Sequence, residues 1–177
     1  MHRAATDHRR GFSLLEMSLV VIITAILAML AAPSLSVMGE ARHAAAADEV
    51  ERILLDARAR ALAAGRPVGV RIDVPAQTLE TIEILNAGDL PGAATDPLGQ
   101  PSPAVHLGSL FPGATLDAVS VHAPGSDGAT IWFAFDGTPQ ARTGTGSLVG
   151  ALATDATLSL SGGRTLTIHA GSGAITR

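Results

Sequence analysis

The chain has 177 residues, and 47% of them are hydrophobic, which suits one domain with a core of its own plus an appendage. The 12 basic residues are all arginine and face 16 acidic ones, so the net charge is −4 and nothing global indicates nucleic-acid binding. The absence of cysteine and lysine excludes disulfides, thiolate zinc sites, cysteine nucleophiles and the lysine-dependent phosphate loop.

An apolar run from Phe12 to Ala32 dominates the N-terminal part of the chain, and Glu16 is its only charged residue. As a helix these 21 residues would be roughly 32 Å long, against about 30 Å for the hydrocarbon core of a bilayer. Arg9 and Arg10 lie just before the run, and the positive-inside tendency keeps such an end in the cytoplasm. The sequence therefore predicts a transmembrane helix over residues 12–32, with everything after it outside.

A second helical pattern follows directly and predicts that the helix continues over residues 33–64. One apolar stripe repeats at three- and four-residue spacing and consists of Val50, Ile53, Leu54, Ala57 and Ala61. Another face alternates in charge at i,i+4 steps, as a solvated helix surface does, with Asp48, Arg52, Asp56 and Arg60. Gly65 and Pro67 form a stop signal, in which the glycine takes a left-handed C-cap. Pro33 and Gly39 inside the helix predict a kink.

The apolar period changes to 2 after Pro67, which predicts an antiparallel β domain over residues 65–177. Val68–Val74 alternates apolar and polar residues, and "TLETIEIL" predicts a second strand. Residues 86–104 are rich in Gly, Pro, Asp, Ala and Ser and predict a long variable surface loop. Further strands are expected near "VHLGSL", "ATLDAVSVHA", "ATIWFAFDG", "ATLSLSG" and "RTLTIHAG".

The β domain contains no recognisable catalytic or metal-binding motif. His106, His122 and His169 fall in expected strands without the spacing of metal ligands, which favours ordinary surface or core histidines. "GTGSLVG" lacks the context of a dinucleotide loop and indicates a flexible turn. Asp89 and Asp96 are a weak pattern for Ca²⁺, because they lack the Asp-x-Asp spacing. We therefore expect no catalytic residue, cofactor or metal.

Glu16 argues against the simplest interpretations of the N-terminus, which are a signal anchor, a cleaved secretory signal and, from "RRGF", a twin-arginine signal. A carboxylate in an apolar membrane segment costs free energy, and a signal sequence has no use for it. In addition, the small residues where a signal peptidase could cut lie next to Pro33, and the apolar run leads directly into a patterned helix.

The order of residues around Glu16 resembles the class III signal of type IV pilins and type II secretion pseudopilins. That pattern is a basic leader ending in glycine, then an aromatic residue, a short polar residue, two apolar residues, glutamate and a long apolar segment. This chain has Gly11, Phe12, "SLL", Glu16 and "MSLVVIITAILAMLAA", followed by Pro33, where many members carry a helix-kinking proline. The resemblance implies a leader over residues 1–11, cleavage by a prepilin peptidase between Gly11 and Phe12, and N-methylation of Phe12.

The same resemblance suggests a purpose for Glu16. A cationic amine on Phe12 at membrane depth is tolerated chiefly when an opposite charge lies beside it. In the family, the carboxylate is thought to meet the amine of a neighbouring subunit during assembly, so Phe12 and Glu16 would act together as assembly residues. The expected partners are other pilins or pseudopilins, the prepilin peptidase, the inner-membrane assembly platform and, before assembly, membrane lipid.

The C-terminal part narrows the resemblance to the GspH and FimT group. Residues 129–144, "ATIWFAFDGTPQARTG", are similar to the F-x-F-x-x-x-G strand and turn of that group, and "RTLTIHAGSGAITR" is similar to its closing strands. Trp132 and Phe133 should point to opposite faces of the sheet, with Phe135 on the Phe133 face. The implied fold is α+β: a long kinked N-terminal helix, transmembrane in its first half, packed on two small antiparallel sheets.

Three functions follow from these observations. The favoured one is a minor pseudopilin of a type II secretion system, anchored by one helix in a bacterial inner membrane, with its domain in the periplasm and its place near the tip of the pseudopilus. The alternative is a minor pilin of a type IV pilus. DNA binding is disfavoured, because the C-terminal region offers only Arg164 and Arg177. A tethered periplasmic enzyme or binding module is a third hypothesis, which a cluster of His106, His122 and acidic residues would support.

Overall fold

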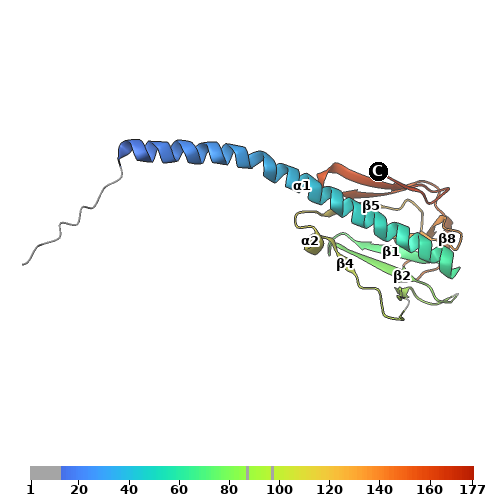
Figure 1. Cartoon of the computed structure of the whole chain (residues 1–177). Coiled ribbons are helices and arrows are strands. Elements are labelled where there is room, and N and C mark those ends of the chain that lie inside the picture. The colour runs from blue at the N-terminus through green and yellow to red at the C-terminus, as the bar shows by residue number, and fades with distance from the viewer. Residues whose placement is uncertain (1–12, 87, 97) are drawn as a thin grey trace, which may run out of the picture. The chain divides into compact units, whose positions relative to one another are not determined.

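The computed structural model describes residues 13–177 apart from residues 87 and 97, and for residues 30–36 it describes the backbone alone. The chain divides into two compact units, Met1–Met38 and Gly39–Arg177. One helix, α1 (Leu14–Ala64), contributes to both units (Figure 1). Gly11 and Phe12, where cleavage and methylation are expected, lie outside the described residues.

The backbone of α1 is helical at both Pro33 and Gly39, and the boundary between the two units lies between Met38 and Gly39. The helix ends as the sequence predicts. Gly65 has φ +63°, and its N–H donates to the carbonyl oxygen of Ala61 at 3.0 Å. The kink at Pro33 and Gly39 remains a prediction.

The Gly39–Arg177 unit contains two antiparallel sheets and two short helical turns. The turns are α2 (Leu107–Leu110) and the 3₁₀ turn Ser161–Gly163. The strands are β1 (Val68–Asp73), β2 (Thr78–Glu83), β3 (Gly92–Ala93), β4 (Val105–His106), β5 (Leu116–Ser120), β6 (Thr130–Phe133), β7 (Pro139–Arg142), β8 (Leu148–Ala151), β9 (Ala156–Leu160), β10 (Arg164–Ile168) and β11 (Ile175–Thr176). The seven-stranded sheet has the order β3-β2-β1-β6-β7-β8, with β4 also paired to β2, and the other sheet has the order β11-β10-β9-β5.

The second half of α1 lies along both sheets within this unit, and all three meet in one core (Figure 1). The predicted apolar stripe of α1 is buried at every position. It shares a cluster with Val70 of β1, Phe133 of β6, Leu158 of β9 and Leu166 of β10. The α+β architecture predicted from the sequence is therefore confirmed, a helix packed on two antiparallel sheets.

A smaller apolar cluster consists of Ile82, Ile84 and Trp132. Trp132 is opposite Gly69 in the pairing of β1 with β6, and a Cβ at Gly69 would lie 2.7 Å from the indole ring. Glycine is therefore needed at position 69 so that the tryptophan can cover the strand. As expected, Trp132 and Phe133 are both buried in neighbouring positions of β6 and belong to separate clusters.

Arg58 of α1 connects the helix to two loops at the far end of the chain. Its guanidinium donates to the carbonyl oxygens of Gly137 at 3.1 Å and Ser172 at 2.8 Å. The two loops pack so closely that a Cβ at Gly173 would overlap the carbonyl oxygen of Gly137. Gly173 also has φ +65°, a region in which residues with a Cβ are strained.

Four local predictions were wrong or incomplete. Phe135 does not share the buried face of Phe133, because β6 ends at Phe133 and Phe135 is 65% exposed. The segment "VHLGSL" is a strand only at β4 and then turns into α2, because Leu107 is buried and its N–H donates to the carbonyl oxygen of Gln77 at 3.1 Å. "GTGSLVG" is a turn only at its start, since β8 begins at Leu148.

The fourth incomplete prediction concerns the face of α1 on which charges alternate at i,i+4 steps. Arg60 pairs with Asp56 at 2.7 Å as the i,i+4 spacing predicts. Arg52 pairs with Glu49 instead of Asp48. Asp48 pairs with Arg177, so the C-terminal residue is attached to α1.

Candidate assembly interface

Ser13 is the N-cap of α1, and Glu16 lies three residues after it. The backbone N–H of Glu16 donates to the hydroxyl oxygen of Ser13 at 3.2 Å and to its carbonyl oxygen at 3.1 Å. Ser-x-x-Glu is a sequence signature of a helix N-terminus, and a carboxylate in the first turn also complements the helix dipole. The pattern "SLLE" therefore indicates that a helix begins at this point, and the interpretation of the sequence, which considered only the charge of Glu16, missed it.

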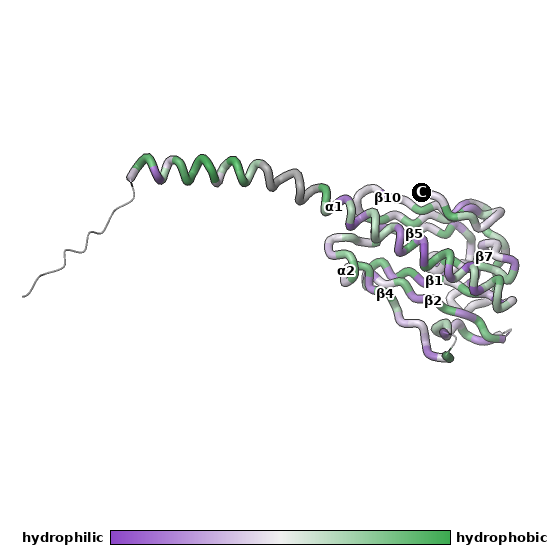
Figure 2. Tube along the Cα trace, in the orientation of Figure 1, coloured by the Kyte–Doolittle hydropathy of each residue, from purple (hydrophilic) through white to green (hydrophobic). Residues whose placement is uncertain are grey.

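The first half of α1 is apolar on all its sides. The large hydrophobic side chains from Leu14 to Met29 are between 48% and 88% exposed. Figure 2 shows the hydrophobic colour over most of this segment. A helix with a single apolar stripe packs against one partner, whereas a helix apolar all around is covered on every side in its working environment. No helix of the chain, as far as its side chains are described, combines the length and apolarity that crossing a membrane requires.

Three polar side chains interrupt this apolar surface between Leu14 and Met29, and two of them are satisfied by the helix itself. Ser18 donates to the carbonyl oxygen of Leu14 at 2.8 Å, and Thr24 donates to that of Val20 at 2.9 Å. Such bonds let a hydroxyl remain in apolar surroundings. The Glu16 carboxylate, by contrast, makes no hydrogen bond or ion pair with any residue from 13 onward that the structure describes. A complementary charge would have to come from elsewhere.

The part of α1 in the Gly39–Arg177 unit also carries two half-exposed leucines. Leu55 and Leu62 lie seven residues apart, which places them on one side of a helix, and they are 44% and 50% exposed. Leu54, next to Leu55, is fully buried in the core. The helix thus uses one face to hold the domain together and leaves a second apolar face available for contact.

The β domain contains a line of an acid, an imidazole and a hydroxyl, formed by Asp155, His169 and Thr176. His169 contacts the Asp155 carboxylate with Nδ1 at 2.9 Å and the Thr176 hydroxyl with Nε2 at 3.0 Å. Asp155 also accepts from the N–H of Ala170, which together with His169 lowers the pKa of the carboxyl. This acid, imidazole and hydroxyl line is exposed and lines none of the described cavities, and Thr176 pairs with Thr167 across β10 and β11. These contacts connect β11 and the turn after β10 to the turn before β9.

The candidate metal residues are not brought together. Asp89 accepts hydrogen bonds from Asn86, and Asp96 accepts from the backbone of Leu98 and Gln100, so the two carboxylates serve separate turns. Among the residues that the structure describes, no group of three or more His, Asp and Glu could hold a metal ion.

Residues 6–32 match the family model of the prokaryotic N-terminal methylation motif. The whole fold is similar to that of the minor pseudopilin EpsH of the type 2 secretion system of Vibrio cholerae, with 19% identity, a TM-score of 0.51, and 76% of this chain and 94% of that one covered. It is equally similar to the type IV minor pilin FimU of Pseudomonas aeruginosa strain PAO1, with 18% identity, a TM-score of 0.50, and coverage of 77% and 88%. This chain carries the N-terminal methylation motif and has a pilin-like fold.

The curated proteins contain no sequence match to this pilin-like chain. The methylation motif includes the expected cleavage residues Gly11 and Phe12 as well as Glu16. The two similar structures are those of a minor pseudopilin and a minor pilin.

Proposed function

We propose that the chain is a minor pseudopilin of a type II secretion system, a structural subunit near the tip of a periplasmic fibre that helps to export folded proteins. The observation that carries the proposal is the helix of residues 14–29, which is apolar on all sides and holds one carboxylate without a partner in its own described chain. Membrane lipid would cover this surface before assembly, and the helices of neighbouring subunits would cover it afterwards. The mature subunit would begin at methylated Phe12.

In this proposal Glu16 determines the register between subunits. The new amine of Phe12 and the carboxylate of Glu16 each cost free energy in apolar surroundings, and the two costs offset each other when the groups pair across subunits. Removing one member of a buried ion pair costs about 3–5 kcal/mol, which corresponds to roughly a hundredfold or more in an equilibrium constant. Incorporation into the fibre should therefore be sensitive to the charge at position 16, while membrane insertion should not be.

A minor pilin of a type IV pilus is the second candidate, because the similarity to FimU is as great as that to EpsH. A secretion subunit is favoured over a DNA-binding pilin because the C-terminal region has little uncompensated positive charge. Arg177 is paired with Asp48 and Glu51 of α1, so its charge is already compensated, and Arg164 is the one other arginine after residue 142. A DNA-binding tail needs clustered uncompensated arginines.

The test compares Glu16→Gln and Glu16→Ala with the matched control Ser18→Ala, in full-length protein expressed in its host. We expect all three variants to be inserted and cleaved, with methyl-Phe12 found by mass spectrometry. Incorporation into sheared fibres should fall about a hundredfold for both Glu16 variants and stay normal for Ser18→Ala, whose hydroxyl is bonded only to its own helix. Normal incorporation of both Glu16 variants would refute the proposed role, and an intact Met1 or a start near Ser34 would refute the processing.

The two kinds of fibre are distinguished by deleting the gene. The proposal predicts that export of folded proteins fails while pilus-dependent motility persists. The opposite result would identify the chain as a minor pilin.

A further inference from the structure

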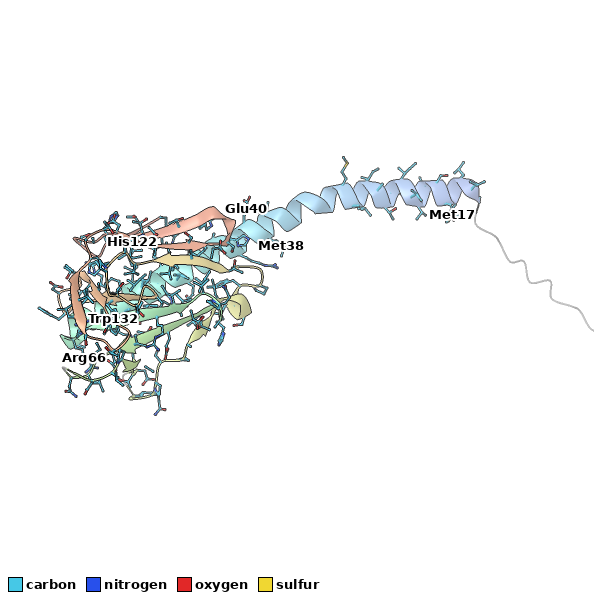
Figure 3. The ribbon with its side chains drawn as sticks, turned by 180° about the vertical axis from the view of Figure 1, so that it is seen from behind. Met17, Met38, Glu40, Arg66, His122 and Trp132 are labelled. Atoms are coloured by element: carbon cyan, nitrogen blue, oxygen red, sulfur yellow. The ribbon has the colours of Figure 1, made fainter. Side chains whose placement is uncertain are left out.

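A groove lies at the end of the domain where α1 stops. It has a volume of about 430 Å³ and is lined by the turn after α1, residues that follow β2, and the β7–β8 hairpin. Figure 3 shows Arg66, which lines the groove, at the end of the domain away from Glu40, with Trp132 on the same side. The groove therefore lies at the opposite end of the Gly39–Arg177 unit from Glu40.

The guanidinium of Arg142 is held in a fixed position in this groove. It lies 5.7 Å from the centre of the Trp132 ring, close enough for a cation–π contact. Nη1 donates to the carbonyl oxygen of Gly146 at 2.5 Å. With the amide of Gln140 turned so that its oxygen faces the arginine, Nε and Nη2 donate to that oxygen at 2.8 and 3.2 Å. These bonds use three of the five N–H groups of the side chain and leave two for another acceptor.

No carboxylate of the described chain forms an ion pair with Arg142. Burial disfavours the charged form of its guanidinium and lowers its pKa. Arg66 beside it donates to the buried carboxylate of Glu83 at 2.7 Å and is compensated. Asp89 also lines the groove, but it accepts hydrogen bonds from the backbone and side-chain nitrogens of Asn86. A half-buried charge held by neutral groups alone is an unusual feature, because such charges are ordinarily paired.

Apolar side chains lie beside this charge. Leu85 and Leu148 line the groove and are 57% and 61% exposed, and Val149 next to Leu148 is exposed as well. β8 is the outer strand of its sheet, but it has only four residues, and its register with β7 shifts between Ala141 and Arg142. A short, bulged edge strand resists pairing with a further strand. The groove is therefore suited to the side chains of a loop rather than to an added strand.

We propose that this groove docks a loop of a neighbouring pilin-like subunit, which places an acidic side chain against Arg142 and apolar side chains against Leu85 and Leu148. The inference rests on the proposed function, in which the chain assembles with other subunits. Arginine and tryptophan dominate the energetics of many protein interfaces, and a preorganised guanidinium binds a carboxylate with two parallel hydrogen bonds. Charge complementarity selects the acidic loop, because Arg142 is half-buried and forms no ion pair with a described carboxylate, whereas the negative charge of Asp89 is exposed to water, which screens it.

The experiment uses the full-length chain in its host, with the photocrosslinker benzoylphenylalanine in place of the exposed Leu148. Irradiation should yield a crosslink whose partner peptide, identified by mass spectrometry, is an acidic loop of a pilin-like subunit. Arg142→Met should reduce the yield at least tenfold. Arg71→Met is the matched control and should leave the yield unchanged, since Arg71 is on β1, outside the groove, and pairs with Glu80.

Four results would overturn the proposal: no crosslink, a crosslink to lipid or to an exported protein, a partner peptide without an acidic residue, or equal loss in both arginine variants. The emission of Trp132, the single tryptophan of the chain, checks that each variant is folded. In the positive case, Arg142→Glu should abolish the crosslink, and replacing the acidic residue of the partner by arginine should restore it. Failure of this charge exchange would also count against the proposal.

Incorporation of the crosslinker variant into the fibre is measured in parallel. Normal incorporation without the crosslink would refute docking in the groove and leave the proposed function intact. Failure of the unaltered chain to enter any fibre would refute the proposed function itself.

Discussion

Two adjacent leucines of α1 should have very different effects on the stability of the domain. Leu54 is fully buried in the core shared by α1 and both sheets, whereas Leu55 is 44% exposed on another side of the helix. We predict that Leu54→Ala destabilises the domain by about 3 kcal/mol, because the removed methyl groups leave a cavity in the core. Leu55→Ala should change stability by about 0.5 kcal/mol or less, as most surface substitutions do.

The assay is thermal unfolding of the full-length chain in detergent, followed by the fluorescence of Trp132. This residue is 1% exposed, so its emission should shift to longer wavelength when the domain unfolds and water reaches the ring. For a unit the size of Gly39–Arg177, 1 kcal/mol corresponds to about 3 °C in melting temperature. Leu54→Ala should therefore melt about 10 °C below the unaltered protein, and Leu55→Ala within about 2 °C of it.

Equal losses for the two variants would refute this assignment of faces on α1, because they would mean that Leu55 is packed in the free subunit. Equal stability of Leu54→Ala and the unaltered chain would mean that the helix does not hold the two sheets together.

Two further predictions concern the loops at the C-terminal end. Gly173→Ala should destabilise the domain by about 3 kcal/mol in urea unfolding, because its positive φ and the overlap with a neighbouring carbonyl oxygen disfavour a methyl group. The control Gly171→Ala should have little effect, because there is open space around Gly171. The pKa of Asp155 is lowered by the N–H of Ala170 and by His169, so its contribution to stability should be present above pH 4 and disappear as the pH falls through its folded-state pKa. Asp155→Asn should therefore be less stable than the unaltered chain at pH 6, and the difference should shrink as the pH falls below 4; a constant difference across this range would contradict the sign of the shift.

The sequence was sufficient to predict the helices and strands that bury only one of their faces. The apolar stripe containing Leu54 and the alternating strand beginning at Val68 were both predicted, because a helix or strand with one buried face repeats its own geometry in the order of residues. The C-cap at Gly65 was predictable for a similar reason, since it depends on the conformational freedom of one residue and on a nearby proline.

The β7–β8 hairpin could not be predicted in this way. "PQAR" contains polar residues, yet Gln140 is buried because it pairs with Trp132 in β6 and supports Arg142. Its burial depends on a residue of the neighbouring strand and on the bulge in β8, neither of which leaves a periodic pattern. The groove around Arg142 was missed for the same reason, because its walls come from three segments that are far apart in the sequence.

Glu16 illustrates how one residue can satisfy two separate requirements. Its backbone N–H donates to the N-cap Ser13, an arrangement that the chain forms alone and that most residues at position 16 would preserve. Its carboxylate complements the helix dipole but has no hydrogen-bond or ion-pair partner among the described residues. Cleavage after Gly11, as proposed, would leave Ser13 in place and would put the new amine next to the helix cap, where the positive end of the helix dipole disfavours a cation. The amide variant Glu16→Gln is informative for this reason, because it retains the shape and the helical position of the residue and removes only the charge.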